Sequence, residues 1–121
     1  MPVQWFTIQM ALSDIESVED GPTQFVPGSH YSGRNPNSQS DPEFEGKGPV
    51  SMFCKAGDIY LQNNQCWHRG APVLSDRTRY VFQSQYAAKW AYTRFGVYND
   101  VPVAPSVLDR ADETLRELLG T

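Results

Sequence analysis

The chain has little of what marks several common classes of protein. It contains only two cysteines, Cys54 and Cys66, too few for a disulfide scaffold, so we expect reduced thiols and a cytoplasmic location. Its apolar runs are far shorter than a membrane span, and the N-terminus lacks the basic and apolar regions of a secretion signal. Its 10 basic residues are scattered among 14 acidic ones, which argues against binding to nucleic acid or to a membrane. We therefore expect a small-molecule or protein partner.

Several kinds of active site are missing as well. The sequence has no glycine-rich phosphate loop, no nucleophile elbow and no convincing Ser/His/Asp set, so it does not support hydrolase or kinase chemistry. It has two histidines, and no His-x-Asp or His-x-Glu occurs anywhere. A facial iron site needs two histidines and one carboxylate, so the sequence looks like half of such a site.

What is present predicts a mainly β domain. A chain of 121 residues with 40% hydrophobic residues can bury a modest core, and we expect one domain over residues 1–121. β-Branched and aromatic runs between turn signals predict strands at residues 3–12, 23–26, 50–53, 59–61 and 79–87. The first of these should be buried on most of both faces. A short C-terminal helix, capped by Ser106 or Asp109, should end at Gly120.

Residues 31–48 predict a long loop. They are rich in Gly, Asn, Ser, Pro and charged residues and show almost no apolar periodicity. A stretch of that length in a compact domain is usually a lid, a binding loop or a disordered segment. We expect this loop to face a substrate.

The strand at residues 79–87 alternates strictly, with Arg79 and Gln83 on one face. If the aromatic face packs on a second layer, this polar face lines an interior, which implies a ligand. The planar guanidinium of Arg79 suits a carboxylate because it donates two parallel hydrogen bonds. Alternatively, the face is exposed to solvent and Arg79 pairs with Asp76 or Asp58.

His68 precedes Arg69 and Gly70, where a small residue would let the chain turn beside the imidazole. A neutral imidazole binds divalent iron or zinc, although a single histidine is more often structural or exposed. Cys66 and His68 form a Cys-x-His pair that weakly resembles a zinc site. His30, the other histidine, fits a hydrogen-bonding role in its turn better than metal ligation.

Together these segments resemble the phytanoyl-CoA dioxygenase family of iron(II)- and 2-oxoglutarate-dependent oxygenases. Their order and spacing are similar to the C-terminal half of the family, and the similarity covers nearly the whole chain. The motifs that carry it are Asp20-Gly21-Pro22-Thr23, Val26-Pro27-Gly28-Ser29-His30, Gly57-Asp58-Ile59, His68-Arg69-Gly70 and Ser75-Asp76-Arg77-Thr78-Arg79-Tyr80.

The resemblance implies a fold and a site. The fold would be a double-stranded β-helix, a jelly-roll or cupin-like arrangement of two sheets, here incomplete. By the same resemblance His68 is the distal histidine ligand of Fe(II), and Arg79 binds the distal carboxylate of the cosubstrate 2-oxoglutarate. Met10 and Gln83 are further candidates for contact with cosubstrate or substrate.

The absent His-x-Asp pair leaves three interpretations open. The chain is the C-terminal part of a longer dioxygenase that hydroxylates a small molecule, which is the interpretation we favour. Alternatively, it completes a barrel by pairing with another subunit through exposed sheet edges, as a homo-oligomer. In the third interpretation it is a non-catalytic, self-associating β-sandwich that binds a small carboxylate at Arg79.

Overall fold

The computed structural model describes residues 3–36, 41–88, 90 and 102–120. The chain forms two compact units, residues 1–85 and residues 86–121. The first unit holds nearly all of the β structure and the second holds the C-terminal helices. The expectation of a single domain stays a prediction.

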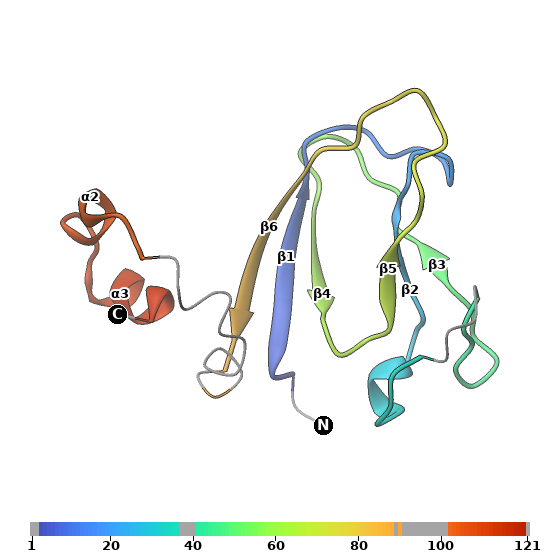
Figure 1. Cartoon of the computed structure of the whole chain (residues 1–121), viewed down its shortest axis with the longest axis horizontal. Helices are drawn as coiled ribbons and strands as arrows, with labels where there is room; N and C mark the ends of the chain where they lie inside the picture. Colours follow the sequence, from blue (N-terminus) through green and yellow to red (C-terminus); the bar gives the residue numbers. More distant parts are fainter. Residues whose placement is uncertain (1–2, 37–40, 89, 91–101, 121) are drawn as a thin grey trace. The chain divides into compact units, whose positions relative to one another are not determined.

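The β structure consists of two three-stranded sheets (Figure 1). The first has the order β4-β1-β6 and the second the order β3-β2-β5. The strands are β1 (Trp5–Ala11), β2 (Thr23–Phe25), β3 (Val50–Ser51), β4 (Ile59–Asn63), β5 (His68–Gly70) and β6 (Val81–Ala87). The chain therefore passes from one sheet to the other four times. These crossings lie between β1 and β2, β3 and β4, β4 and β5, and β5 and β6. Such crossing is typical of jelly-roll folds.

The two sheets face one another across an interior that is unusually polar. Antiparallel pairing places Gln9 opposite Tyr60 and Thr7 opposite Gln62, so these side chains share the inner face of the β1–β4 pair. Thr7, Gln9 and Gln62 are buried. The Tyr60 ring packs edge-on against Phe25 of the other sheet, with ring centroids 6.4 Å apart.

The outer face of the same sheet is apolar. Ile8 and Met10 of β1 alternate with the buried Thr7 and Gln9, and they lie opposite Leu61 and Ile59 of β4. Leu61 and Ile59 are exposed. A buried polar face and an exposed apolar face invert the usual pattern of a half-buried sheet, so β1 is not buried on both faces as we expected.

Two expectations about local structure are wrong. Residues 68–70 form strand β5 rather than a turn, because Phe25 and Thr23 of β2 pair with His68 and Gly70. A short C-terminal helix that ends at Gly120 is confirmed as α3 (Glu113–Leu119), and a separate short helix, α2 (Pro105–Leu108), precedes it. Asp112 caps α3 because its carboxylate accepts the Leu115 N–H at 2.7 Å, a cap that the sequence pattern placed at Ser106 or Asp109.

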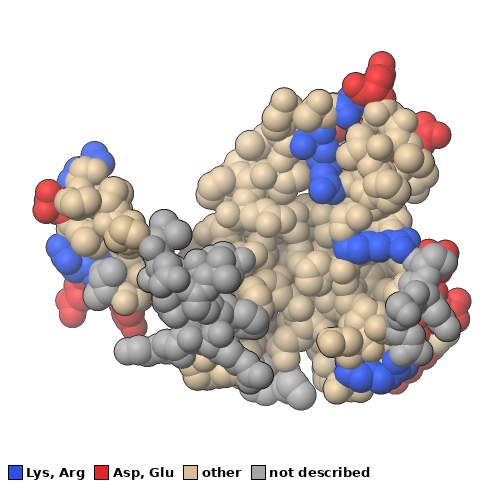
Figure 2. Space-filling model, in the orientation of Figure 1, with Lys and Arg blue, Asp and Glu red and all other residues tan. Residues whose placement is uncertain are grey.

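The segment predicted as a loop contains little regular structure in its described parts. A short 3₁₀ helix, η1 (Ser29–Tyr31), leads into it, and an isolated bridge joins Phe44 and Lys47. The face shown in Figure 2 carries Lys and Arg in separate small groups rather than in one patch. Within the residues that the structure describes, no helix is both long and apolar enough to cross a bilayer.

Candidate functional site

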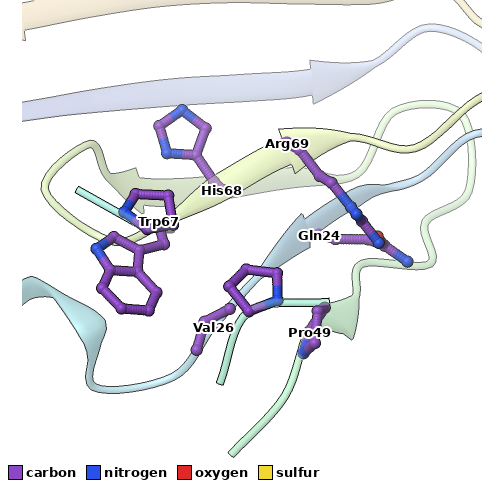
Figure 3. A pocket seen from close by; sticks show the side chains of 8 residues that line it. Gln24, Val26, Pro49, Trp67, His68 and Arg69 are labelled. Atoms are coloured by element: carbon purple, nitrogen blue, oxygen red, sulfur yellow. The ribbon is translucent and has the colours of Figure 1, made fainter. Parts of the chain in front are cut away.

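Strand β5 presents His68 and Gly70 on one face. His68 lies opposite Phe25 and Gly70 lies opposite Thr23 of β2, and residues paired this way project to the same side. The rings of His68 and Phe25 confirm this, since their centroids are 6.0 Å apart. Figure 3 shows the imidazole of His68 pointing away from the side chains of its neighbours Trp67 and Arg69. His68 therefore faces the other sheet.

A backbone carbonyl determines which nitrogen of the His68 ring carries the proton. Nδ1 lies 2.8 Å from the carbonyl oxygen of Cys66, and because a carbonyl only accepts, Nδ1 carries the proton of the neutral ring. The lone pair is then on Nε2, the atom that a metal ion would bind. The residue as a whole is exposed.

Arg79 reaches the same face from the segment before β6. A Cβ atom at Gly70 would lie 3.3 Å from Nη2 of Arg79, so the guanidinium occupies the space that a side chain at this position would fill. Nη1 of Arg79 also donates a hydrogen bond to the carbonyl oxygen of Gly21. Among the described residues no ion pair joins Arg79 to Asp76 or Asp58, the acidic partners considered as alternatives.

A buried carboxylate organises the turn that holds Arg79. Asp20 accepts hydrogen bonds from the backbone N–H groups of Glu16 and Ser17, each at 3.0 Å, and from the hydroxyl of Ser75 at 2.9 Å. These hydrogen bonds hold the pKa of Asp20 below its usual range, and the bond from the Glu16 N–H has the largest effect. They tie the loop between β1 and β2 to the segment before Arg79.

Sequence reasoning missed the polar side chains between the two sheets. The Tyr60 hydroxyl donates to Oε1 of Gln9 at 2.8 Å and lies 3.0 Å from the hydroxyl of Thr23. Gln9 in turn donates to Oε1 of Gln62. The signal was present, because Gln9 and Gln62 interrupt otherwise apolar strands. A short apolar run does not reveal which face is inside, so the signal could not be interpreted.

The other predicted residues do not join His68 and Arg79. Met10 lies on the outer face of β1, opposite Ile59. Gln83 is exposed on β6, on the same side of the strand as Val81. Contact of Met10 and Gln83 with a cosubstrate stays a prediction.

The remaining histidine and the cysteines do not complete a metal site. His30 Nδ1 lies 3.4 Å from Sγ of Cys66, and the His30 ring packs against Tyr31 in a tilted arrangement with centroids 4.0 Å apart. Cys54 and Cys66 are both free thiols. Across the described part of the chain, no group of three or more His, Cys, Asp or Glu side chains is placed to hold a metal ion. His68 is thus a single candidate ligand.

A cavity of about 130 Å³ lies beside β2 and β5 (Figure 3). Its walls are mostly apolar, and Arg69, one of the lining residues, bonds to Gln24 at 2.8 Å and to Asp41 at 3.0 Å. Arg79 does not line this cavity. The lining residues are Gln24, Val26, Pro36, Pro42, Pro49, Trp67, His68 and Arg69.

Solved structures share this fold. HygX from Streptomyces hygroscopicus with nickel, 2-oxoglutarate and hygromycin B bound is 23% identical, with a TM-score of 0.60 over 72% of this chain and 37% of that one. HygX with iron bound is 26% identical, with a TM-score of 0.57 over 72% of this chain and 38% of that one. The chain thus spans less than two fifths of the length of these structures. The expected fold class, mainly β and of the double-stranded β-helix type, is confirmed.

A family model agrees with the structural likeness. The model described as phytanoyl-CoA dioxygenase (PhyH) matches residues 3–81, which include β1 to β5 and Arg79. That range holds every motif on which the resemblance was based. The chain belongs to the phytanoyl-CoA dioxygenase (PhyH) family.

Proposed function

We propose that the chain forms one wall of the active site of an iron(II)- and 2-oxoglutarate-dependent dioxygenase that hydroxylates a small molecule. In this proposal His68 is one metal ligand and Arg79 binds the distal carboxylate of 2-oxoglutarate. Members of the PhyH family use iron(II) and 2-oxoglutarate, which supports the assignment. The observation that carries it is that the Arg79 guanidinium lies against Gly70, which is two residues from His68 and on the same face of β5.

The spacing on β5 suits a dicarboxylate. His68 and Gly70 are two residues apart on an extended strand, which separates their Cα atoms by roughly 6–7 Å. The Arg79 guanidinium lies against Gly70, as the 3.3 Å approach of Nη2 indicates. In this proposal a dicarboxylate binds Arg79 at one end and extends along the same face of β5 toward His68.

The described residues do not fit a complete iron site. One imidazole is available where a facial site needs two histidines and a carboxylate, and no cluster of three such ligands occurs in the described ranges. We propose that the other ligands come from protein outside these ranges, either a further segment or a second copy of the chain. Strand β5, which holds His68, is an edge strand of its sheet. Strand β6, which follows Arg79, is an edge strand of the other sheet. Their unpaired edges are suited to adding further strands.

Isothermal titration with 2-oxoglutarate tests the anion site without any metal. Arg79→Gln removes the charge and the planar donors, and a hydrogen bond to a charged group contributes about 1.5–3 kcal/mol, or roughly a 10- to 150-fold change in affinity. Arg77→Gln is the matched control, because Arg77 is exposed and bonds to Glu16 at 3.0 Å. Equal affinities in the wild type and in Arg79→Gln would remove Arg79 from the site.

The described residues contain no cluster of three metal ligands, which favours a second candidate function. In this function the chain is a module that binds a small carboxylate without catalysis and associates with itself. The two functions differ in one assay, which measures succinate formed from 2-oxoglutarate by the purified chain with iron(II). Succinate formation would exclude the non-catalytic module. Sedimentation that shows a sharp monomer at all concentrations would exclude pairing through the sheet edges.

We also propose a cytoplasmic location, which the free thiols of Cys54 and Cys66 support.

A further inference from the structure

A buried hydroxyl is connected to His68 by a chain of hydrogen bonds. Ser29 is 0% exposed, and its Oγ accepts the backbone N–H of Trp67 at 2.8 Å and donates to the carbonyl oxygen of Val26 at 2.7 Å. The Trp67 N–H belongs to the same planar peptide group as the carbonyl of Cys66, which accepts Nδ1–H of His68 at 2.8 Å. Three hydrogen bonds therefore form one continuous path from the Val26 carbonyl to the imidazole.

A tight turn holds the Ser29 hydroxyl at this place. Gly28 has φ of +83° and ψ of −12°, the conformation of the third residue of a type II turn, and Pro27 suits the second position. The Ser29 N–H closes the turn by donating to the carbonyl oxygen of Val26 at 3.3 Å. At the same point the Val26 N–H donates to the carbonyl oxygen of Trp67 at 3.0 Å. The turn after β2 thus carries Ser29 onto the backbone that leads into β5.

The Trp67 side chain anchors this backbone from the other face of the sheet. Alternation along an extended strand sends Trp67 and His68 to opposite sides, as Figure 3 shows. Trp67 is 6% exposed, and its indole N–H donates to the carbonyl oxygen of Arg34 at 2.9 Å. With the indole fixed on one side and the N–H bonded to Ser29, the carbonyl of Cys66 is held toward the imidazole.

We propose that Ser29 is a positioning residue that keeps His68 in one tautomer, with the proton on Nδ1 and the lone pair on Nε2. Ser29 acts only through the peptide group between Cys66 and Trp67. Hydrogen bonds at the two ends of one peptide group polarise it in the same direction, so each strengthens the other. The use of the Nε2 lone pair by a ligand rests on the proposed function of His68.

Long-range ¹H–¹⁵N nuclear magnetic resonance of the imidazoles measures the two tautomers in the full chain, without metal or 2-oxoglutarate. Spectra are recorded at about pH 9, where histidine rings are neutral. In the wild type, His68 should be almost entirely in the Nδ1–H form. Ser29→Ala should lower the ratio of the Nδ1–H to the Nε2–H form about two- to tenfold, the range that corresponds to one net hydrogen bond. Ser29→Cys should give an intermediate ratio, because a thiol is a weak donor and acceptor of similar size.

Thr7→Val is the matched control. It removes another buried hydroxyl, which is on a residue 2% exposed and donates to Asn64 at 2.9 Å. This hydroxyl has no bond to the peptide group before His68, so the tautomer ratio should not change. An equal fall in Thr7→Val and Ser29→Ala would mean that general loosening of the sheets moves the ratio, and the proposal would be wrong.

The remaining outcomes separate this inference from the proposed function. An Nε2–H form in the wild type, or a wild-type ratio in Ser29→Ala, would overturn the role of Ser29. If Ser29→Ala does not fold, a wild-type ratio in Ser29→Cys would overturn it instead. The proposed function fails if Arg79→Gln binds 2-oxoglutarate as the wild type does, whatever the tautomer. If Arg79→Gln loses affinity while the ratio is insensitive to Ser29, only the inference about Ser29 is wrong.

Discussion

Gly21→Ala should be among the most destabilising single substitutions in the first unit. Gly21 has φ of +69°, a conformation that costs another residue about 1–2 kcal/mol. An added Cβ would also lie 2.6 Å from Cγ2 of Val73 and 2.9 Å from the carbonyl oxygen of Ala71. Backbone cannot move aside as a flexible side chain can, and such overpacking costs typically about 1–3 kcal/mol. We therefore expect a total loss of about 2–5 kcal/mol.

Urea denaturation followed by tryptophan fluorescence measures this loss. Gly33→Ala is the control, because Gly33 has φ of +64° and no heavy atom within 4 Å of its Cβ position. Gly33→Ala should lower the free energy of unfolding only by the cost of the left-handed conformation, about 1–2 kcal/mol. If the two variants lose the same free energy of unfolding, the close packing of Gly21 against Val73 and Ala71 does not exist in solution.

Two further predictions concern Arg79 and the turn before it. Gly70→Val should weaken 2-oxoglutarate binding about tenfold in calorimetry by displacing the guanidinium, which lies 3.3 Å from the Cβ position, and unchanged affinity would contradict the shared face of β5. Asp20→Asn should be less stable than the wild type at pH 7. Because the folded pKa of Asp20 is lowered, its contribution is present above the unfolded pKa of about 4 and is lost as the pH falls through the folded value. The stability difference, measured by thermal unfolding, should therefore shrink below about pH 4, and a constant difference would argue against an ionised Asp20.

Much of the fold could be predicted because β-branched and aromatic runs between turn signals indicate strands from the local sequence alone. Strand β1 was expected at residues 3–12 and spans Trp5–Ala11, and β6 was expected at residues 79–87 and spans Val81–Ala87. Strand β5 was missed. Its three residues His68, Arg69 and Gly70 show no apolar alternation, and their strand geometry comes from pairing with β2, a partner more than 40 residues away.

The site was only partly predictable for a related reason. His68 and Arg79 stand out in the sequence because an imidazole suits a metal ion and a guanidinium suits a carboxylate. Ordinary strand residues take their role from the face of the sheet on which they lie, and this applies to Thr23, Tyr60 and Gln9. Met10, a candidate from the family resemblance, lies on the outer face of β1, whereas its neighbour Gln9 lies on the inner face. A rule that apolar residues point inward fails in a sheet that lines a polar interior.

The central claim is that His68 and Arg79 face a common ligand on β5. Nuclear magnetic resonance of the histidine side chains, with His68 assigned through His68→Gln, tests it most directly during titration with 2-oxoglutarate. The account predicts that the His68 imidazole signals move in the wild type, that those of His30 stay in place, and that neither moves in Arg79→Gln. His68 signals that remain fixed while 2-oxoglutarate binds, or that move equally in Arg79→Gln, would contradict it.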